Sequence, residues 1–121
     1  MLTLGLTGRI WVAVAPVDAR KSFDTLAAVV TAALDRDPLS GDLFVFANRK
    51  RDRLAILAWQ GDGFALLRRR LEKGTFALPA AGDASVAVTA TQLAMILGGL
   101  DPAKATPRRR YARPNESADS A

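Results

Sequence analysis

The sequence predicts a small α+β protein in which a mostly antiparallel sheet is packed against one or two helices. Short β-branched and aromatic runs recur along the chain, other segments place apolar residues at helical spacing, and compact polar turns separate them. Half of the 121 residues are apolar and 24% are charged, so the chain is long enough and apolar enough for one hydrophobic core.

The first strand is expected near residues 10–15, where the apolar run IWVAVA stops at Pro16. Proline ends the strand because it lacks the N–H group that a sheet ladder requires. The first helix is expected near residues 22–34, with Ser22 as its N-cap and the acid Asp24 in its first turn, where the helix dipole favours negative charge. A loop, DRDPLSGD, follows this helix.

The next three strands are expected near residues 43–47, 53–60 and 64–71, forming an antiparallel meander. The polar turn NRKRD joins the first two strands, and the residues Gly61-Asp62-Gly63 provide positive-φ positions for the tight return to the third. The segment FALLRRRL also fits a helix ended by Gly74, and the strand is the favoured reading.

Two short strands and a second helix are expected after the meander. TFALP, residues 75–79, has the character of an edge strand, and residues 86–88 form another short strand. A helix is expected near residues 91–98, with Thr91 as its N-cap and Gly98-Gly99 at its end.

The chain divides by composition into a globular domain and a tail. The domain is expected to cover residues 1–100. In residues 101–121 apolar side chains become rare, while proline, arginine and small polar residues dominate, so this segment is expected to be a disordered basic tail.

Composition excludes several kinds of active site. The absence of cysteine and histidine removes disulfides, thiolate chemistry and the commonest zinc ligands. The carboxylates are scattered through separate loops and no glycine-rich nucleotide loop is present, so we expect no enzyme, no metal and no cofactor. No secretion signal and no membrane-spanning run is recognised, which indicates a cytoplasmic protein.

Positive charge is the strongest functional signal, because the net charge is +5 and arginine provides most of it. The planar guanidinium group suits phosphate, and the meander brings the turn at residues 48–52 close to Arg68, Arg69 and Arg70. On a strand, two of these three arginines lie on one face and one on the other. The residues expected to contact DNA are Arg49, Lys50, Arg51, Arg53, Arg68, Arg69 and Arg70, joined by Arg108, Arg109, Arg110 and Arg113 of the tail.

The expected DNA contact is weak or nonspecific. If Arg49, Lys50, Arg51 and Arg53 each met one phosphate, the logarithm of the affinity would fall with the logarithm of salt with a slope of about −3.6. The alternative is a solvated hairpin tip that only keeps this end of the sheet soluble.

A second polar cluster precedes the first helix and contains Asp18, Arg20, Lys21 and Asp24. Two cations beside a helix N-terminus can bind a phosphate. The same residues can instead form internal ion pairs that fix the loop, and this structural reading is favoured.

Four motifs carry a family resemblance that extends from Arg9 to Asp101. They are D-x-R-K-S/G-F-D at residues 18–24, S-G-x-x-F-V-F-x-N-R-x-x-D-R at 40–53, W-x-x-x-G-F at 59–64 and R-L-E-x-G-x-F-x-x-P at 70–79. These motifs resemble the TnpB-type accessory proteins, products of the second open reading frame, of the bacterial insertion-sequence family numbered sixty-six. Ala58 and Gln60 beside the tryptophan, and Leu67 where an aromatic residue is usual, depart from that pattern.

The resemblance implies a non-catalytic accessory protein of DNA transposition that assists a separate transposase. The alternative is a protein interaction module that assembles the transposition complex without touching DNA. The resemblance implies no binding residues, so the expected DNA contacts depend on the charge argument, and the oligomeric state stays open.

Overall fold

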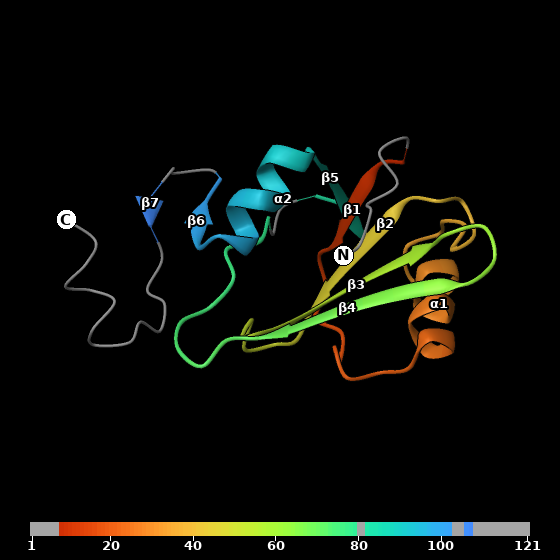
Figure 1. The fold of residues 1–121 in the computed structure, drawn as a ribbon, viewed down its shortest axis with the longest axis horizontal. Coiled ribbons are helices and arrows are strands. Elements are labelled where there is room, and N and C mark those ends of the chain that lie inside the picture. Colours follow the sequence, from red (N-terminus) through yellow and green to blue (C-terminus); the bar gives the residue numbers. More distant parts are fainter. Residues whose placement is uncertain (1–7, 80–81, 103–105, 108–121) are drawn as a thin grey trace.

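The computed structural model describes residues 8–79, 82–102 and 106–107 of the protein. Its elements are β1 (Ile10–Ala13), α1 (Phe23–Ala32), β2 (Leu43–Ala47), β3 (Arg53–Trp59), β4 (Phe64–Arg70), β5 (Ser85–Val88), α2 (Ala90–Leu97), β6 (Leu100–Asp101) and β7 (Thr106–Pro107) (Figure 1). The first five strands form one sheet in the order β4-β3-β2-β1-β5. Only β1 and β2 are parallel within it, so the α+β class with a mostly antiparallel sheet is confirmed.

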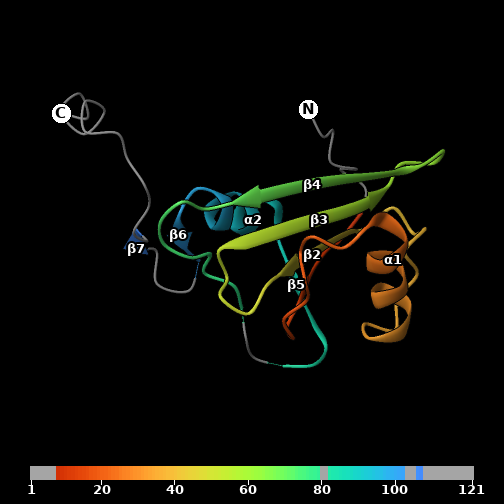
Figure 2. The same ribbon diagram turned by 90° about the horizontal axis from the view of Figure 1, so that it is seen from below.

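The sheet lies between two layers of helix. Leu26 and Val30 of α1 pack on one face, among side chains such as Phe44. Leu93 and Ile96 of α2 pack on the other face in a separate cluster of buried residues. Successive strand residues point to opposite faces, so β1, β2 and β3 each supply both clusters. The two helices are well separated in Figures 1 and 2.

The central strands β1 and β2 are apolar throughout because a helix covers each face of the sheet. Every residue of β1 and of β2 is buried, and both strands read as continuous apolar runs without polar alternation. Helix α1 carries the chain from the end of β1 back to the start of β2, which makes the two strands parallel. β1 ends at Ala13, two residues before the expected end of the strand.

Both helices begin at a side-chain cap. Ser22 caps α1 as expected, with its Oγ accepting from the N–H of Thr25 at 3.5 Å. The expected cap of α2 at Thr91 is wrong, because Thr89 takes this role two residues earlier in a capping box with Gln92. The Thr89 Oγ1 accepts from the Gln92 N–H at 3.0 Å, and the Thr89 N–H donates to the Gln92 side chain at 2.8 Å. Gly98 ends α2, as expected.

The meander of β2, β3 and β4 is confirmed. β3 and β4 pair along their whole length, from Arg53 opposite Arg70 to Trp59 opposite Phe64. The rings of Trp59 and Phe64 meet edge to face with centroids 5.0 Å apart. Residues 64–70 are therefore strand, and the helical alternative for this segment is wrong.

The expected edge strand at residues 75–79 is wrong. This segment has no strand structure, and Phe76 is fully buried in the cluster beneath α2. The Phe76 N–H donates to the carbonyl of Arg51 at 2.7 Å, so the segment is attached to the turn between β2 and β3. The edge beside β1 is occupied by β5, at the place of the short strand expected near residues 86–88.

The C-terminal part of the chain is described only to residue 107. β6 and β7 form a separate two-stranded ladder, with Leu100 opposite Pro107. The tail residues Arg108, Arg109, Arg110 and Arg113 lie outside the described residues, and a domain boundary near residue 100 stays a prediction. Within the described ranges, neither helix has the length and apolar character needed to cross a bilayer.

Candidate nucleic-acid interface

Asn48 holds the turn between β2 and β3 in shape. Its side-chain oxygen accepts hydrogen bonds from the N–H groups of Asp52 at 3.1 Å and Arg53 at 3.0 Å. Its amide nitrogen donates to the Asp52 carboxylate at 2.6 Å. This hydrogen bond lowers the pKa of the Asp52 carboxyl group against the opposing effect of burial, and the positive charges of Arg53 and Lys50 lower it further.

Arg51 has a structural role within this turn. Its φ of 60° is the left-handed conformation, and its carbonyl accepts the N–H of Phe76. Its guanidinium group donates to the carbonyl of Leu78 at 3.1 Å, so the side chain lies against residues 76–78. The Arg51 guanidinium group, one of the expected DNA contacts, is therefore held against the protein and does not point freely into solvent.

Arg49 and Lys50 form the exposed tip of the turn. Within the part of the chain that the structure describes, neither side chain makes a hydrogen bond or an ion pair. Both charges are therefore accessible to an external anion.

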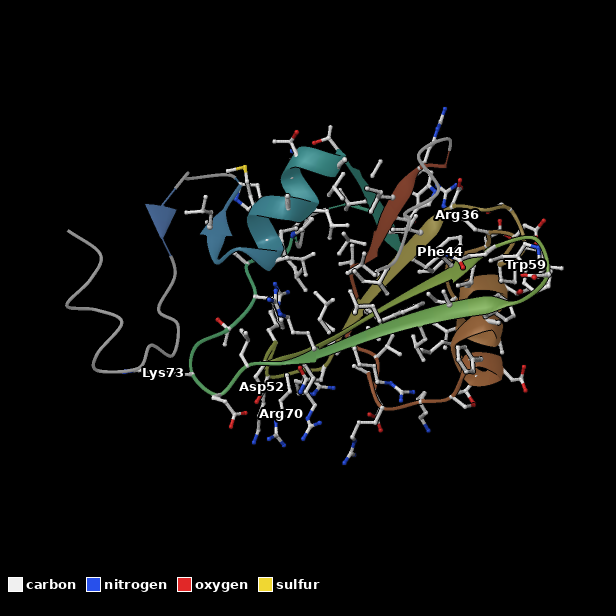
Figure 3. All side chains as sticks on the ribbon, in the orientation of Figure 1. Arg36, Phe44, Asp52, Trp59, Arg70 and Lys73 are labelled. Carbon is white, nitrogen blue, oxygen red and sulfur yellow. The ribbon has the colours of Figure 1, made fainter. Side chains whose placement is uncertain are left out.

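Arg53 and Arg70 lie directly opposite each other on β3 and β4. The only carboxylate within bonding distance of this pair, among the described residues, is Glu72, whose Oε2 lies 3.2 Å from the Arg70 Nε. Both members of that ion pair are more than half exposed. In Figure 3, Arg70 lies near Asp52 at the end of the sheet opposite Trp59.

Arg68 lies on the same face as Arg70 and connects β4 to the loop before α1. Its guanidinium group donates to three backbone carbonyls, those of Ala19 at 3.2 Å, Arg20 at 3.3 Å and Lys21. These bonds hold the loop carrying Arg20 and Lys21 against β4, although the sequence separates the two segments by more than forty residues.

Asp18 and Arg20 form an internal pair within that loop. The Arg20 Nε lies 3.2 Å from the Asp18 Oδ1, and the Arg20 N–H donates to the same oxygen at 3.0 Å. The backbone hydrogen bond, followed by the side-chain one, lowers the pKa of Asp18. Asp24 lies in the first turn of α1, and the described part of the chain contains no ion pair of Asp24 or Lys21.

Arg69 lies on the opposite face of the sheet from Arg68 and Arg70. Its guanidinium group donates at 2.7 Å to the carbonyl of Leu97, at the C-terminus of α2, where a cation is favourable. It borders an open groove of about 520 Å³ beside Leu67 and Ala94. The expected division of the three arginines between two faces is therefore confirmed.

The structure thus brings most, but not all, of the expected cations together. We define the basic edge surface as the cations on the α1 face and at the turn: Arg20, Lys21, Arg49, Lys50, Arg53, Arg68 and Arg70. Arg51 and Arg69 are directed elsewhere. The sequence treats Arg20 and Lys21 as a separate cluster, because no local pattern indicates the long-range contact made by Arg68.

Residues 8–79, 82–102 and 106–107 contain no group of three acidic side chains placed to hold a metal ion. The basic edge surface gathers cations and is a candidate for binding an anion such as phosphate, whose geometry the guanidinium group matches.

Comparisons with known proteins identify the family. The family described as IS66 Orf2-like protein matches residues 8–107. The uncharacterized protein y4hO of Sinorhizobium fredii is 37% identical over 101 residues, which cover 84% of this chain and 88% of that protein. The uncharacterized protein y4jC of the same organism is 39% identical over 93 residues, covering 77% and 80% of the two chains. No solved structure matches the chain. The match across the whole described body shows that the chain belongs to the family of IS66 Orf2-like proteins.

Proposed function

We propose that the protein assists transposition by binding DNA phosphates through the basic edge surface. Family membership indicates an accessory role in transposition. Beyond that role, the protein is proposed to contact DNA and to act beside a separate transposase.

The observation that supports DNA contact best is the pairing of Arg53 with Arg70. Like charges directly opposite on neighbouring strands are destabilising. Glu72 offsets one of these two charges through an exposed ion pair, which contributes little in water. A polyanion lying across this end of the sheet would relieve the remaining repulsion between Arg53 and Arg70. DNA is such a polyanion, because its phosphates are closely spaced along the duplex.

The exposed tip of the turn extends the same surface. Arg49 and Lys50 are solvated and can each reach a phosphate without breaking an internal bond. Such contacts position a duplex but carry no base information, so the binding is weak or nonspecific in sequence. The tail arginines Arg108, Arg109, Arg110 and Arg113 are proposed to add affinity to this contact.

Charge reversal at matched positions tests the proposal. Lys50→Glu and Arg9→Glu change the net charge equally, but Arg9 precedes β1 and lies at the end of the sheet away from the turn. We expect Lys50→Glu to weaken binding of a fluorescent duplex and to lower the steepness of its salt dependence by about 0.9, since one phosphate contact is lost. Arg9→Glu should leave that slope unchanged. Equal effects of both variants would show only a general attraction and would refute a specific basic surface.

A second candidate function is a protein interaction module that assembles the transposition complex. The observation in its favour is Leu67, which is 41% exposed beside the groove near α2. In this case the variant with both Arg49→Glu and Lys50→Glu would still bind the transposase, and the wild type would not bind the duplex even at low salt.

A further inference from the structure

β4 is an edge strand whose outer side has unused backbone hydrogen-bonding groups. The Gln60 N–H donates to the Gly63 carbonyl and the Leu71 N–H donates to the Asp52 carbonyl, each at 2.8 Å. Between these two ends of the antiparallel ladder, residue pairs that exchange backbone hydrogen bonds alternate with pairs that do not. Ala65, Leu67 and Arg69 are therefore bonded to β3. The N–H and C=O groups directed away from the sheet belong to Phe64, Leu66, Arg68 and Arg70.

No backbone or side-chain group of the described residues is bonded to the outer side of this strand. The side chains of Arg68 and Arg69 are held on the two faces of the sheet, by the loop before α1 and by the end of α2. The strand contains no proline, and its pairing with β3 runs without a bulge, so it lacks two common devices that protect an edge from pairing.

We propose that β4 pairs antiparallel with β4 of a second copy of this chain, about a twofold axis that passes beside Leu67. In this register, Phe64 lies opposite Arg70 of the second copy and Leu66 lies opposite Arg68. All four outward-facing residues then exchange both of their backbone hydrogen bonds, and all seven residues of each strand are paired. The two sheets become one continuous sheet.

The sequence of β4 is complementary to itself in this register. Its first half is apolar and its second half is cationic, so antiparallel pairing places each cation opposite an apolar residue. Arg70 would lie beside the Phe64 ring of the second copy, which favours a cation–π contact. A shift of the axis toward the C-terminus would place cation opposite cation, which is destabilising.

Leu67 provides the apolar centre of the proposed contact. It is 41% exposed and lines the groove near Ala94 and Leu97 on the α2 face. Pairing places the Leu67 side chains of the two copies directly opposite each other and covers them both. Arg68 and Arg70 belong both to this strand and to the basic edge surface, but the proposed pairing uses the backbone edge of β4 and does not depend on the DNA contact.

Disulfide trapping tests the register, because the natural chain contains no cysteine. Leu67 would form a pair without backbone bonds, whose Cα atoms lie about 4.5 Å apart, within the usual range of about 4.4–6.8 Å for a disulfide. We expect Leu67→Cys to form covalent dimers rapidly under mild oxidation. Two control variants should crosslink much more slowly: Ala65→Cys, which is out of register with its own copy, and Leu39→Cys, at a more exposed leucine in a loop.

Equilibrium sedimentation of the full chain without DNA provides the second measurement. We expect a reversible dimer for the wild type, and a dissociation constant at least about tenfold higher for Leu67→Lys, since a favourable cross-strand pair is replaced by a like-charge pair. Leu39→Lys, which adds the same charge, should dimerise as the wild type does. A wild type that is monomeric up to submillimolar concentration, or Leu67→Cys crosslinking no faster than Leu39→Cys, would overturn the proposal. Either result leaves the duplex titrations unaffected.

Discussion

Replacing Arg68 should reveal that this arginine stabilises the fold. The perturbation is Arg68→Met, which keeps most of the aliphatic length and removes the guanidinium group. The variant loses three hydrogen bonds to the carbonyls of Ala19, Arg20 and Lys21. The matched control is Arg49→Met, because Arg49 is exposed and makes no hydrogen bond or ion pair within the described residues.

The magnitude follows from the exposure of those bonds. Water can partly replace the two exposed hydrogen bonds, those to the carbonyls of Arg20 and Lys21. The three bonds together therefore contribute about 2 kcal/mol to the free energy of unfolding, toward the low end for bonds of this kind. Removing a cation near Arg53 and Arg70 relieves repulsion worth about 0.5 kcal/mol. The expected net loss in the free energy of unfolding is therefore about 1.5 kcal/mol, or roughly 6–12 °C in Tm for a domain of this size.

Urea denaturation followed by tryptophan fluorescence measures this difference. Arg49→Met should lie within about 0.5 kcal/mol of the wild type, as surface substitutions usually do. If Arg68→Met were as stable as Arg49→Met, the link between β4 and the loop before α1 would contribute nothing, and the assignment of Arg20 and Lys21 to the basic edge surface would lose its structural basis.

The remaining predictions concern pH and the core. The pKa of Asp52 lies below its ordinary value of 3.8 in the folded state, so its contribution to stability is present above that value and is lost as the pH falls through the lowered pKa. Asn48→Ala should raise the pKa of Asp52 toward 3.8 in an NMR titration of the carboxyl carbon, and an unchanged pKa would show that the Asn48 amide is not its cause. Phe76→Ala should cost about 3–5 kcal/mol in chemical denaturation, because the ring is fully buried. Phe23→Ala, at a ring that is 44% exposed, should cost about 0.5 kcal/mol, and similar losses for both would contradict the observed burial.

The elements predicted well from the sequence are those fixed by local patterns. Apolar runs between turn residues identified β2 and β3 closely, and the side chain of Ser22 identified the start of α1. Errors arose where two local signals competed. Thr89 and Thr91 can both cap a helix, and only the residue three positions later, Gln92, completes the capping box of Thr89.

The sequence could not show which cations are used inside the fold. Arg51, Arg68 and Arg69 look like their exposed neighbours in sequence, but each donates to a backbone carbonyl of a distant segment. Those carbonyls belong to loops and to a helix end, and no residue pattern in the sequence predicts that they accept these hydrogen bonds. The composition of TFALP likewise predicts an edge strand, although its phenylalanine is buried beneath α2.

The bonds of Arg68 and Arg69 to carbonyls have an electrostatic consequence. A carbonyl is neutral, so an arginine that donates to it keeps its full charge. The charge of an arginine beside a carboxylate, in contrast, is largely cancelled when it is felt from a distance. The fold therefore fixes these charges in place without neutralising them. The resulting long-range potential would guide a polyanion toward this end of the molecule before any contact forms, and would weaken as counterions accumulate.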